Sequence, residues 1–304
     1  MMKVSVLIPT YNAGTDIIDL LRAIYNQKLK QQNELEVIII DSSSTDHTVE
    51  TVKTKFPKTK VIVIPNKEFD HGGTRNALYT LSTGELLLYM TQDAIPADEY
   101  LIENLISSFE DEKVMISFAR QLPKSDAAPL EVFARNFNYP SVSILKSKEK
   151  IKELGIKTFF NSNVCSMYRR SLFTKFKGFR EKIILNEDMI LASEAILNDY
   201  YVYYNAEAKV YHSHNYNLKQ QSKRYFDIGM AFQETEHLLS MASNEKEGIK
   251  MVFNQIKYLY KNKKISLIPY SIVESGIKFI SYNLGKRHTI FPHHIKQKLS
   301  AYMK

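Results

Sequence analysis

Two carboxylates in this sequence follow short apolar runs of the kind that form buried strands. Asp93 comes shortly after Leu86–Leu88, and Asp41 directly follows Val37–Ile40. In a twisted α/β sheet the carboxyl ends of the strands line the ligand crevice. Because carboxylate oxygens bind hard cations and accept hydrogen bonds, Asp93 is positioned to hold a metal ion or a phosphate-bearing ligand.

Strand and helix patterns alternate around these two acids. Apolar runs predict four strands, at residues 4–9, 36–41, 61–64 and 86–88. Apolar residues at helical spacing predict a helix over 17–24, and the polar turn Ser42–Asp46 can cap another helix near residue 47. The loop 69–76 leads into a third helix, which Gly84 ends. This alternation predicts an α/β fold with a mostly parallel sheet and right-handed crossovers.

Beyond residue 100 the pattern is less regular. We expect further strands at residues 114–119, 161–168, 202–204 and 208–212. A surface loop is expected over 122–130, followed by a partly mobile helical region over 131–157 that suits acceptor contacts. A helix opens with the adjacent acids Glu187 and Asp188, which there face the positive end of the helix dipole. Favourable charge at the start of a helix is one explanation of this pair, and a functional role is the other.

Composition describes an ordinary soluble globular chain of 304 residues, with 44% hydrophobic and 24% charged residues. Cys165 is the only cysteine, which excludes an intramolecular disulfide and a cysteine-based metal site and fits a reducing compartment. No apolar run approaches the roughly 20 residues that a transmembrane helix needs. The start of the chain predicts a first strand and not a signal peptide.

Positive charge is concentrated in the last fifth of the chain. The sequence has 41 Lys and Arg against 33 Asp and Glu; residues 246–304 hold 12 and 2 of these, which leaves 29 and 31 elsewhere. Such a basic segment suits an anionic membrane surface or a nucleic acid. We expect residues 216–304 to form a helical, basic region on a membrane surface.

Two amphipathic helices are predicted in this basic region. The apolar stripe of the first comprises Ile249, Val252, Phe253, Ile256, Leu259 and Tyr260, and that of the second comprises Val273, Ile277, Ile280 and Leu284. One interpretation is that both stripes pack on the rest of the protein. The other is that a basic amphipathic surface lies on the cytoplasmic leaflet. Both hold if one helix docks while the lysine-rich side of the other faces lipid.

Taken together, the motifs resemble those of family 2 glycosyltransferases. They occur in the family's order over about residues 4–215: Pro9-Thr10-Tyr11-Asn12, Ile39–Asp41 with Ser43–Asp46, Gly73–Asn76 with Gly84, the strand end at Asp93, and Glu187-Asp188. Three further segments are most similar to the bacterial rhamnosyltransferase branch of the family: Phe69–Gly73, Thr91–Ala94 and His212–Tyr216.

The resemblance implies a GT-A fold over residues 1–215, a Rossmann-like mixed sheet that binds a nucleotide-sugar donor. By resemblance, Thr10 and Tyr11 line the base, and Asp41 accepts a hydrogen bond from the N3–H of a pyrimidine. Arg75 is placed near the base or the phosphates. The remaining donor-binding residues that the resemblance assigns are Asn12, His71, Gly72, Gln92 and Asp93.

The resemblance also supplies metal ligands and catalytic residues. The family's Asp-x-Asp motif is Thr91-Gln92-Asp93 here, so Asp93 alone holds the Mn²⁺ or Mg²⁺ from this motif, and metal dependence is expected to be weaker than usual. His212 is the further ligand; His214, on the same face of a strand, is the alternative. Asp188 matches the catalytic base, and Glu187 orients Asp188 or the acceptor.

The expected function is an inverting transfer of L-rhamnose from dTDP-L-rhamnose to a hydroxyl of a lipid-linked or growing cell-surface polysaccharide. The enzyme is expected in the bacterial cytoplasm, peripherally on the inner face of the plasma membrane. A UDP-hexose or UDP-N-acetylhexosamine donor is an alternative, because uracil and thymine present the same N3–H. A catalytically inactive membrane- or glycan-binding module is another. Nucleic-acid binding is not expected, because the basic region carries no known nucleic-acid motif.

Overall fold

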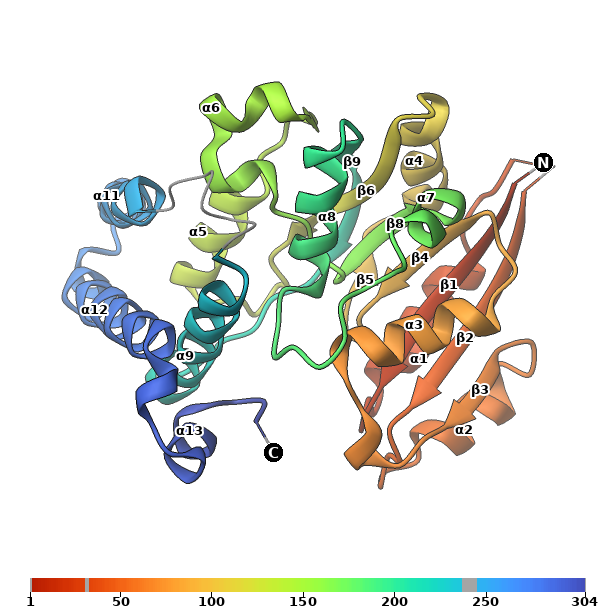
Figure 1. Cartoon of the computed structure of the whole chain (residues 1–304), viewed down its shortest axis with the longest axis horizontal. Coiled ribbons are helices and arrows are strands. Elements are labelled where there is room, and N and C mark those ends of the chain that lie inside the picture. Colours follow the sequence, from red (N-terminus) through yellow and green to blue (C-terminus); the bar gives the residue numbers. More distant parts are fainter. Residues whose placement is uncertain (1, 31–32, 237–244, 304) are drawn as a thin grey trace.

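A mixed β-sheet with helices on both faces organises the protein (Figure 1). The computed structural model describes residues 2–30, 33–236 and 245–303. The strands of the described residues are β1 Lys3–Thr10, β2 Glu34–Asp41, β3 Lys60–Val63, β4 Leu86–Met90, β5 Ile95–Pro96, β6 Val114–Leu122, β7 Ile144–Lys146, β8 Cys165–Arg169 and β9 Tyr201–Tyr211.

The helices carry the labels of Figure 1. They are α1 Asp16–Tyr25, α2 Thr48–Lys55, α3 His71–Leu81, α4 Leu101–Ser107, α5 Pro129–Asn138, α6 Ile151–Leu154, α7 Arg170–Lys175, α8 Glu187–Leu197, α9 Leu218–Glu234, α11 Glu245–Lys261, α12 Ile268–Lys286 and α13 His293–Leu299. Helices α1, α2 and α4 cover one face of the sheet, and α3, α7 and α8 cover the other. The helix expected at Glu187 and Asp188 is confirmed as α8.

The strand directions decide where a ligand site can form. The sheet order is β3-β2-β1-β4-β8-β6-β9-β5, and β7 also pairs with β9. Neighbours among β1 to β4 are parallel, β6 is parallel to β9, and β8 runs antiparallel between β4 and β6. The carboxyl ends of β1, β2, β4, β6 and β9 therefore lie along one edge of the sheet.

The predicted apolar runs are buried as expected. Every residue of β4 is buried, as is typical of a strand covered by helices on both sides. The helical stripe of α1, formed by Ile17, Leu20, Leu21 and Ile24, packs into the core on one face of the sheet. Sequence periodicity thus predicted the central sheet and its first crossover helix correctly.

The segment predicted as the loop 69–76 is mostly helical. Helix α3 begins at His71, and the Asp70 side chain caps it by accepting a hydrogen bond from the Gly73 N–H at 2.6 Å. The two glycines follow this cap, in the first turn of the helix. Gly84 does not end the helix, which stops at Leu81. A Cβ at Gly84 would collide with the Ser5 side chain on β1, so close packing requires glycine there.

The two strands expected at 202–204 and 208–212 are one strand, β9. A bulge interrupts its pairing with β6, where Asn205 Oδ1 accepts hydrogen bonds from the backbone N–H groups of Glu207 and Ala208. This bulge breaks the apolar pattern without ending the strand. β7 lies in the region expected to be helical, and the strand expected from residue 161 begins only at Cys165.

Helices α9 and α12 pack side by side with very close backbones. A Cβ at Gly229 would strike the Tyr282 carbonyl, and one at Gly285 would strike the Phe226 carbonyl. The buried side of α12 is polar or small, and its residues are Ser271, Glu274, Ser281 and Gly285. The packing interpretation of the second apolar stripe is therefore wrong for most of its length. Among the described residues, no helix combines the length and apolarity needed to cross a bilayer.

Candidate active site

A cluster of one carboxylate and two imidazoles lies at the carboxyl edge of the sheet. His214 Nε2 lies 3.2 Å and His212 Nε2 lies 3.5 Å from Asp93 Oδ2, and the two nitrogens are 3.1 Å apart. Asp93 lies in the turn between β4 and β5, and His212 directly follows β9. The antiparallel pairing of Ile95 with Tyr211 brings these two segments together. His212 and His214 are alternative ligands on sequence grounds, and the structure places both beside Asp93.

The tautomer of His212 follows from its second contact. Its Nδ1 lies 3.0 Å from Gln121 Oε1, which also accepts a hydrogen bond from the Arg135 guanidinium. Guanidinium groups only donate, so the amide oxygen is the atom that faces both partners. His212 must then donate from Nδ1, which leaves a bare lone pair on Nε2 facing Asp93. Burial lowers the pKa of His212 to about 3 and keeps the ring neutral.

The donor set fits a divalent transition metal. Burial opposes ionisation of Asp93, but the pKa of its carboxyl still lies below the ordinary value, so Asp93 is ionised at neutral pH. A lone pair and a carboxylate oxygen that face each other are stabilised by a cation between them. Imidazole nitrogens suit transition metals better than Mg²⁺, and a mixed set with a carboxylate suits Mn²⁺. Histidine ligands typically donate their other ring nitrogen to a neighbouring acceptor, as His212 does to Gln121.

A second cluster surrounds the predicted catalytic acids. Glu187 Oε1 lies 3.0 Å from Arg75 Nη1 and accepts a hydrogen bond of 3.0 Å from Asn163 Nδ2. All three side chains are buried. Burial opposes the charge of Glu187, but Arg75 overcomes this and holds the pKa of Glu187 below its usual range. Glu187 is therefore ionised at neutral pH.

Asp188 lies beside this fixed negative charge. Its Oδ1 accepts from the Met189 N–H at 2.7 Å, and its Oδ2 accepts from the Asn163 N–H at 2.9 Å. Burial and the neighbouring Glu187 raise the pKa of Asp188 to about 7. A general base is most effective when its pKa lies near the working pH. Asp188 therefore has the proton affinity that a base needs near neutrality.

The two clusters belong to one site. Gln121, which orients His212, also donates from Nε2 to Ser162 Oγ at 3.0 Å. Ser162 precedes Asn163, which holds both acids, and the Thr91 N–H donates to the Val164 carbonyl at 3.1 Å. The loop 161–164 thus connects the cluster of Asp93, His212 and His214 to the acid pair Glu187 and Asp188.

The sequence matches a known protein family over more than half of its length. The family model described as glycosyl transferase family 2 matches residues 5–176. The O-antigen chain rhamnosyltransferase RfbN of Salmonella typhimurium is 41% identical over 96% of this chain and 92% of its own length. The O-antigen chain rhamnosyltransferase WbaN of Salmonella anatum is also 41% identical, with the same coverage. This chain belongs to glycosyltransferase family 2.

Solved structures confirm the GT-A type of fold. The mannosyltransferase PcManGT of Pyrobaculum calidifontis, in complex with GDP-Man and Mn²⁺, aligns with a TM-score of 0.66 at 14% identity and covers 95% of this chain and 88% of its own. Staphylococcus aureus TarS in complex with UDP-GlcNAc aligns with a TM-score of 0.56 at 15% identity and covers 95% and 91%. At these identities the likeness concerns the fold alone.

The predicted base-binding residues of this glycosyltransferase lie at the ends of β1 and β2. Asp41 is fully buried, and it accepts hydrogen bonds from Thr10 Oγ1 at 2.8 Å and from the backbone and side chain of Ser44. Its contact with a pyrimidine stays a prediction. Tyr11 and Gln92 exchange two hydrogen bonds, from the Tyr11 N–H at 2.8 Å and to the Tyr11 carbonyl at 3.1 Å.

The other predicted donor-binding residues lie on separate segments: Asn12 follows β1, and Gly72 and Arg75 lie on α3. Asn12 has a left-handed backbone, and its side chain accepts from the Thr45 N–H at 2.8 Å. Gly72 contacts the backbone of Arg180 so closely that a Cβ would collide with its carbonyl, which gives a packing reason for glycine. Arg75 is already paired with Glu187. Contact of these residues with the donor stays a prediction.

A segment from the far end of the chain reaches His71, a contact that the sequence did not predict. The ring of Tyr302 packs edge-on against His71 with centroids 5.4 Å apart, and its hydroxyl accepts from Arg224 Nη1 at 3.1 Å. The Ala301 N–H donates to Asp227 Oδ2 at 2.8 Å, which holds this segment on α9. No local pattern signals the contact, because more than 200 residues separate His71 from Tyr302.

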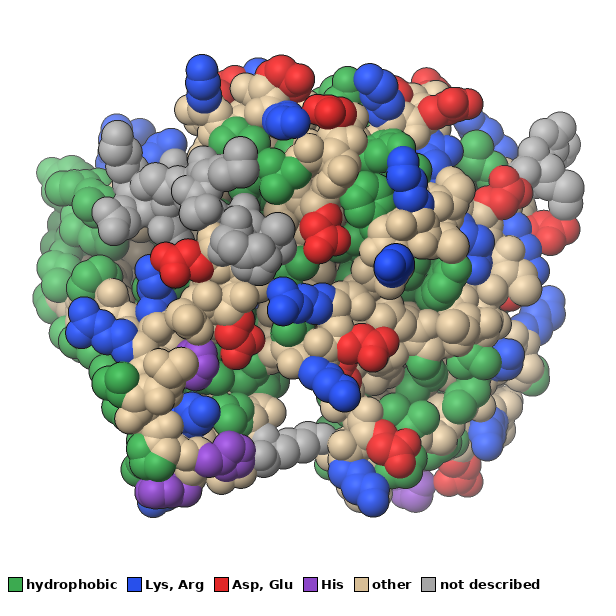
Figure 2. Space-filling view, in the orientation of Figure 1, with side chains coloured by type: hydrophobic (Ala, Val, Ile, Leu, Met, Phe, Trp, Pro, Cys, Tyr) green, Lys and Arg blue, Asp and Glu red, His purple; other side chains and the backbone are tan. Residues whose placement is uncertain are grey.

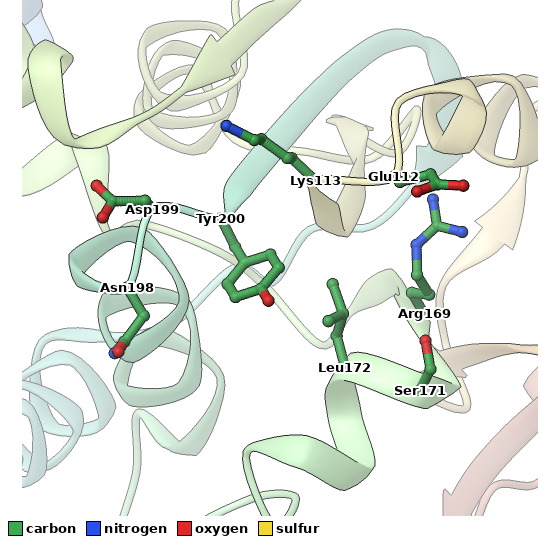
Figure 3. Close-up of a pocket in the computed structure, with 8 residues that line it drawn as sticks. All are labelled: Glu112, Lys113, Arg169, Ser171, Leu172, Asn198, Asp199 and Tyr200. Atoms are coloured by element: carbon green, nitrogen blue, oxygen red, sulfur yellow. The ribbon is translucent and has the colours of Figure 1, made fainter.

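A hollow of about 650 Å³ lies on the opposite edge of the sheet. Its lining residues are Glu112, Lys113, Arg169, Ser171, Leu172, Asn198, Asp199 and Tyr200 (Figure 3). These residues precede β6 and β9, or end or follow β8, so they lie at the amino ends of the parallel strands. The hollow is therefore separate from the active site.

Proposed function

We propose that this family 2 glycosyltransferase moves L-rhamnose from dTDP-L-rhamnose to a hydroxyl of a lipid-linked or growing surface polysaccharide, with inversion at the anomeric carbon. The observation that carries the chemistry is that Asp188, a carboxylate with a pKa near 7, is linked through the loop 161–164 to the Asp93 cluster. The sugar and the polysaccharide acceptor rest on RfbN and WbaN, two O-antigen chain rhamnosyltransferases that match nearly the whole chain.

Asp93, His212 and His214 would hold the divalent cation, and their nitrogen-rich donor set favours Mn²⁺ over Mg²⁺. When bound, the cation stabilises the charge of the departing nucleoside diphosphate as a Lewis acid. The Mn²⁺ in the similarly folded PcManGT supports this assignment. Gln121 fixes the ring of His212, so the imidazole presents a lone pair from Nε2 at neutral pH.

Asp188 removes the proton of the acceptor hydroxyl as that oxygen attacks the anomeric carbon. The attack comes from the face opposite the leaving diphosphate, so a single displacement inverts the configuration and needs no covalent enzyme intermediate. Glu187 stays ionised through Arg75, and its negative charge raises the proton affinity of Asp188. Within the pair, Glu187 thus supplies a fixed negative charge and Asp188 is the base that titrates.

Replacement of Asp188 by Asn tests this proposal. The amide keeps the shape of the carboxylate but cannot take a proton, so transfer should fall by about 10²- to 10⁴-fold. Binding of dTDP-L-rhamnose should persist. Asp199→Asn is the matched control, because Asp199 lines the hollow on the opposite edge of the sheet. Full transfer by Asp188→Asn would contradict the proposal. A wild-type protein that binds donor without turnover would favour the inactive binding module.

We also propose that α11 and α12 place the enzyme on the cytoplasmic face of an anionic membrane. Phe253 and Phe279 are 71% and 70% exposed, and Ile280 is 59% exposed, while the polar side of α12 is buried against α9. Hydrophobic side chains gather over α11 and α12 at the left edge of Figure 2. Lys250, Lys257 and Lys261 flank this apolar surface and complement anionic lipid headgroups.

A further inference from the structure

We infer that Asn163 and Tyr168 are positioning residues that hold the acid pair in its reactive geometry. The inference rests on the proposed role of Asp188 as the base. Asn163 contacts both acids at once: its backbone N–H donates to Asp188 Oδ2 at 2.9 Å, and its side-chain amide donates to Glu187 Oε1 at 3.0 Å. The position of one residue therefore sets the separation and orientation of the two carboxylates.

The direction of every hydrogen bond behind Asn163 is fixed. The ionised Glu187 can only accept, so the NH₂ end of Asn163 must face it and the Oδ1 end must face Tyr168. The Tyr168 hydroxyl then donates to Asn163 Oδ1 at 2.7 Å and accepts from Asn161 Nδ2 at 2.7 Å. Asn161 Oδ1 in turn accepts from Ser166 Oγ at 2.9 Å.

This hydrogen-bond network is buried, and its tyrosine lies on a central strand of the sheet. Tyr168 and Ser166 are fully buried, and Asn161 and Asn163 are each 3% exposed. Tyr168 lies on β8, where it pairs with Leu87 of β4 and Ile116 of β6. Because these four side chains are shielded from bulk water, solvent cannot replace the Tyr168 hydroxyl if it is removed. A buried amide left without its partner must move or remain unsatisfied.

Loss of the Tyr168 hydroxyl should therefore loosen Asn163 and, through it, both acids. The two hydrogen bonds from Asn163 stabilise the ionised forms of Glu187 and Asp188. Weaker hydrogen bonds make deprotonation of the pair harder. The acidic limb of the pH–rate profile should then move to higher pH. The donor-binding cluster at Asp93 is not part of this hydrogen-bond network, so the KM for donor should change little.

Tyr168→Phe and a matched variant test the inference. Tyr204→Phe is the control, because the Tyr204 hydroxyl is also buried and donates at 2.6 Å to the Pro140 backbone carbonyl, away from the acids. The assay follows dTDP release from dTDP-L-rhamnose with a lipid-linked oligosaccharide acceptor. We expect Tyr168→Phe to lower kcat by about 10-fold. It should also shift the acidic limb upward by more than Tyr204→Phe does, with donor KM nearly unchanged.

The inference is overturned if Tyr168→Phe matches Tyr204→Phe in kcat, or if its kcat falls without any shift of the pH profile. Asn163→Ala carries the same test if Tyr168→Phe does not fold. It removes the donor to Glu187 but keeps the backbone N–H to Asp188, and its pH profile should shift in the same direction. Failure of the proposed base is seen separately, as full transfer by Asp188→Asn.

Discussion

His212 Nδ1 lies 3.0 Å from Gln121 Oε1, and this contact decides which nitrogen of His212 faces Asp93. A histidine free to adopt either tautomer would present a proton to the cation for part of the time. Gln121 removes that freedom and also binds Ser162, next to the loop residue that holds the acids. One amide therefore links the cluster of Asp93, His212 and His214 to the loop that holds Glu187 and Asp188.

The first prediction concerns this amide. Gln121→Leu removes the acceptor for His212, so the dissociation constant for Mn²⁺ should rise by about 10- to 100-fold, as for other partners of metal ligands. Calorimetric titration of Mn²⁺ in the presence of dTDP measures the change. Gln297→Leu is the control, because Gln297 is exposed on α13. Equal Mn²⁺ affinity in both variants would show that Gln121 does not orient a ligand.

The second prediction concerns the pH dependence of turnover. Burial and Glu187 raise the pKa of Asp188 to about 7, so the base is protonated and inactive below that pH. With saturating donor, acceptor and Mn²⁺, kcat should rise with pH and reach half its plateau near pH 7. A profile that stays flat from pH 5.5 to 8 would exclude Asp188 as the titrating base.

The third prediction concerns stability. A carboxyl whose pKa is raised on folding stabilises the protein when protonated, and this contribution is lost as pH rises from the unfolded pKa of about 3.9 to the folded pKa of about 7. Asp188→Asn should therefore melt at a higher temperature than wild type at pH 8, with a much smaller difference at pH 4. Calorimetric melting at both pH values measures this. An equal difference at both would contradict the raised pKa.

The fourth prediction concerns the contact between Tyr302 and His71. If His71 lies in the donor site, Tyr302 forms one wall of that site. Tyr302→Ala should then raise the KM for dTDP-L-rhamnose by about 10-fold, a loss of roughly 1.4 kcal/mol, with a smaller effect on kcat. Tyr100→Ala is the control, because Tyr100 is exposed at the start of α4 and contacts Lys28. Equal KM values would place Tyr302 outside the donor site.

The fifth prediction concerns the membrane surface. Phe253→Glu combined with Phe279→Glu should lower binding to vesicles rich in phosphatidylglycerol by at least about 10-fold, because burying each phenylalanine contributes roughly 1.5–3 kcal/mol. Vesicle sedimentation measures binding. The control is Val142→Glu, an exposed apolar position before β7. Unchanged binding of the double variant would direct attention to a protein partner for α11 and α12.

The fold was predictable where burial is uniform. β1, β2 and β4 are covered on both faces over most of their length, so each contains a continuous apolar run that sequence shows directly. β9 was divided in two because its bulge interrupts that pattern. The apolar stripe of α12 was visible in the sequence, but the sequence did not show whether that stripe faces the protein or the solvent. A helical wheel shows an apolar face without showing what covers it, and here the close approach at Gly229 and Gly285 buries the other side.

The candidate site was partly predictable for a similar reason. Asp93 and His212 follow strands and carry chemically distinctive groups, and the structure brings them together. Gln121 and Asn163 act through neutral amides, which have no motif of their own, and their roles depend on contacts between distant segments. Asp41 was expected to meet the base, but the structure adds Thr10 and Ser44 as its partners, which no spacing rule specifies.

Donor selectivity tests the central claim most directly. Melting temperatures of the full chain would be measured with dTDP-L-rhamnose, UDP-glucose, UDP-GlcNAc and GDP-mannose, each with and without Mn²⁺. A ligand that binds only the native state stabilises it, by about 2.7 kcal/mol at 100 times its dissociation constant. We predict the largest shift with dTDP-L-rhamnose and dependence of that shift on Mn²⁺. A larger shift with a UDP-sugar, or no shift with any nucleotide sugar, would contradict the account.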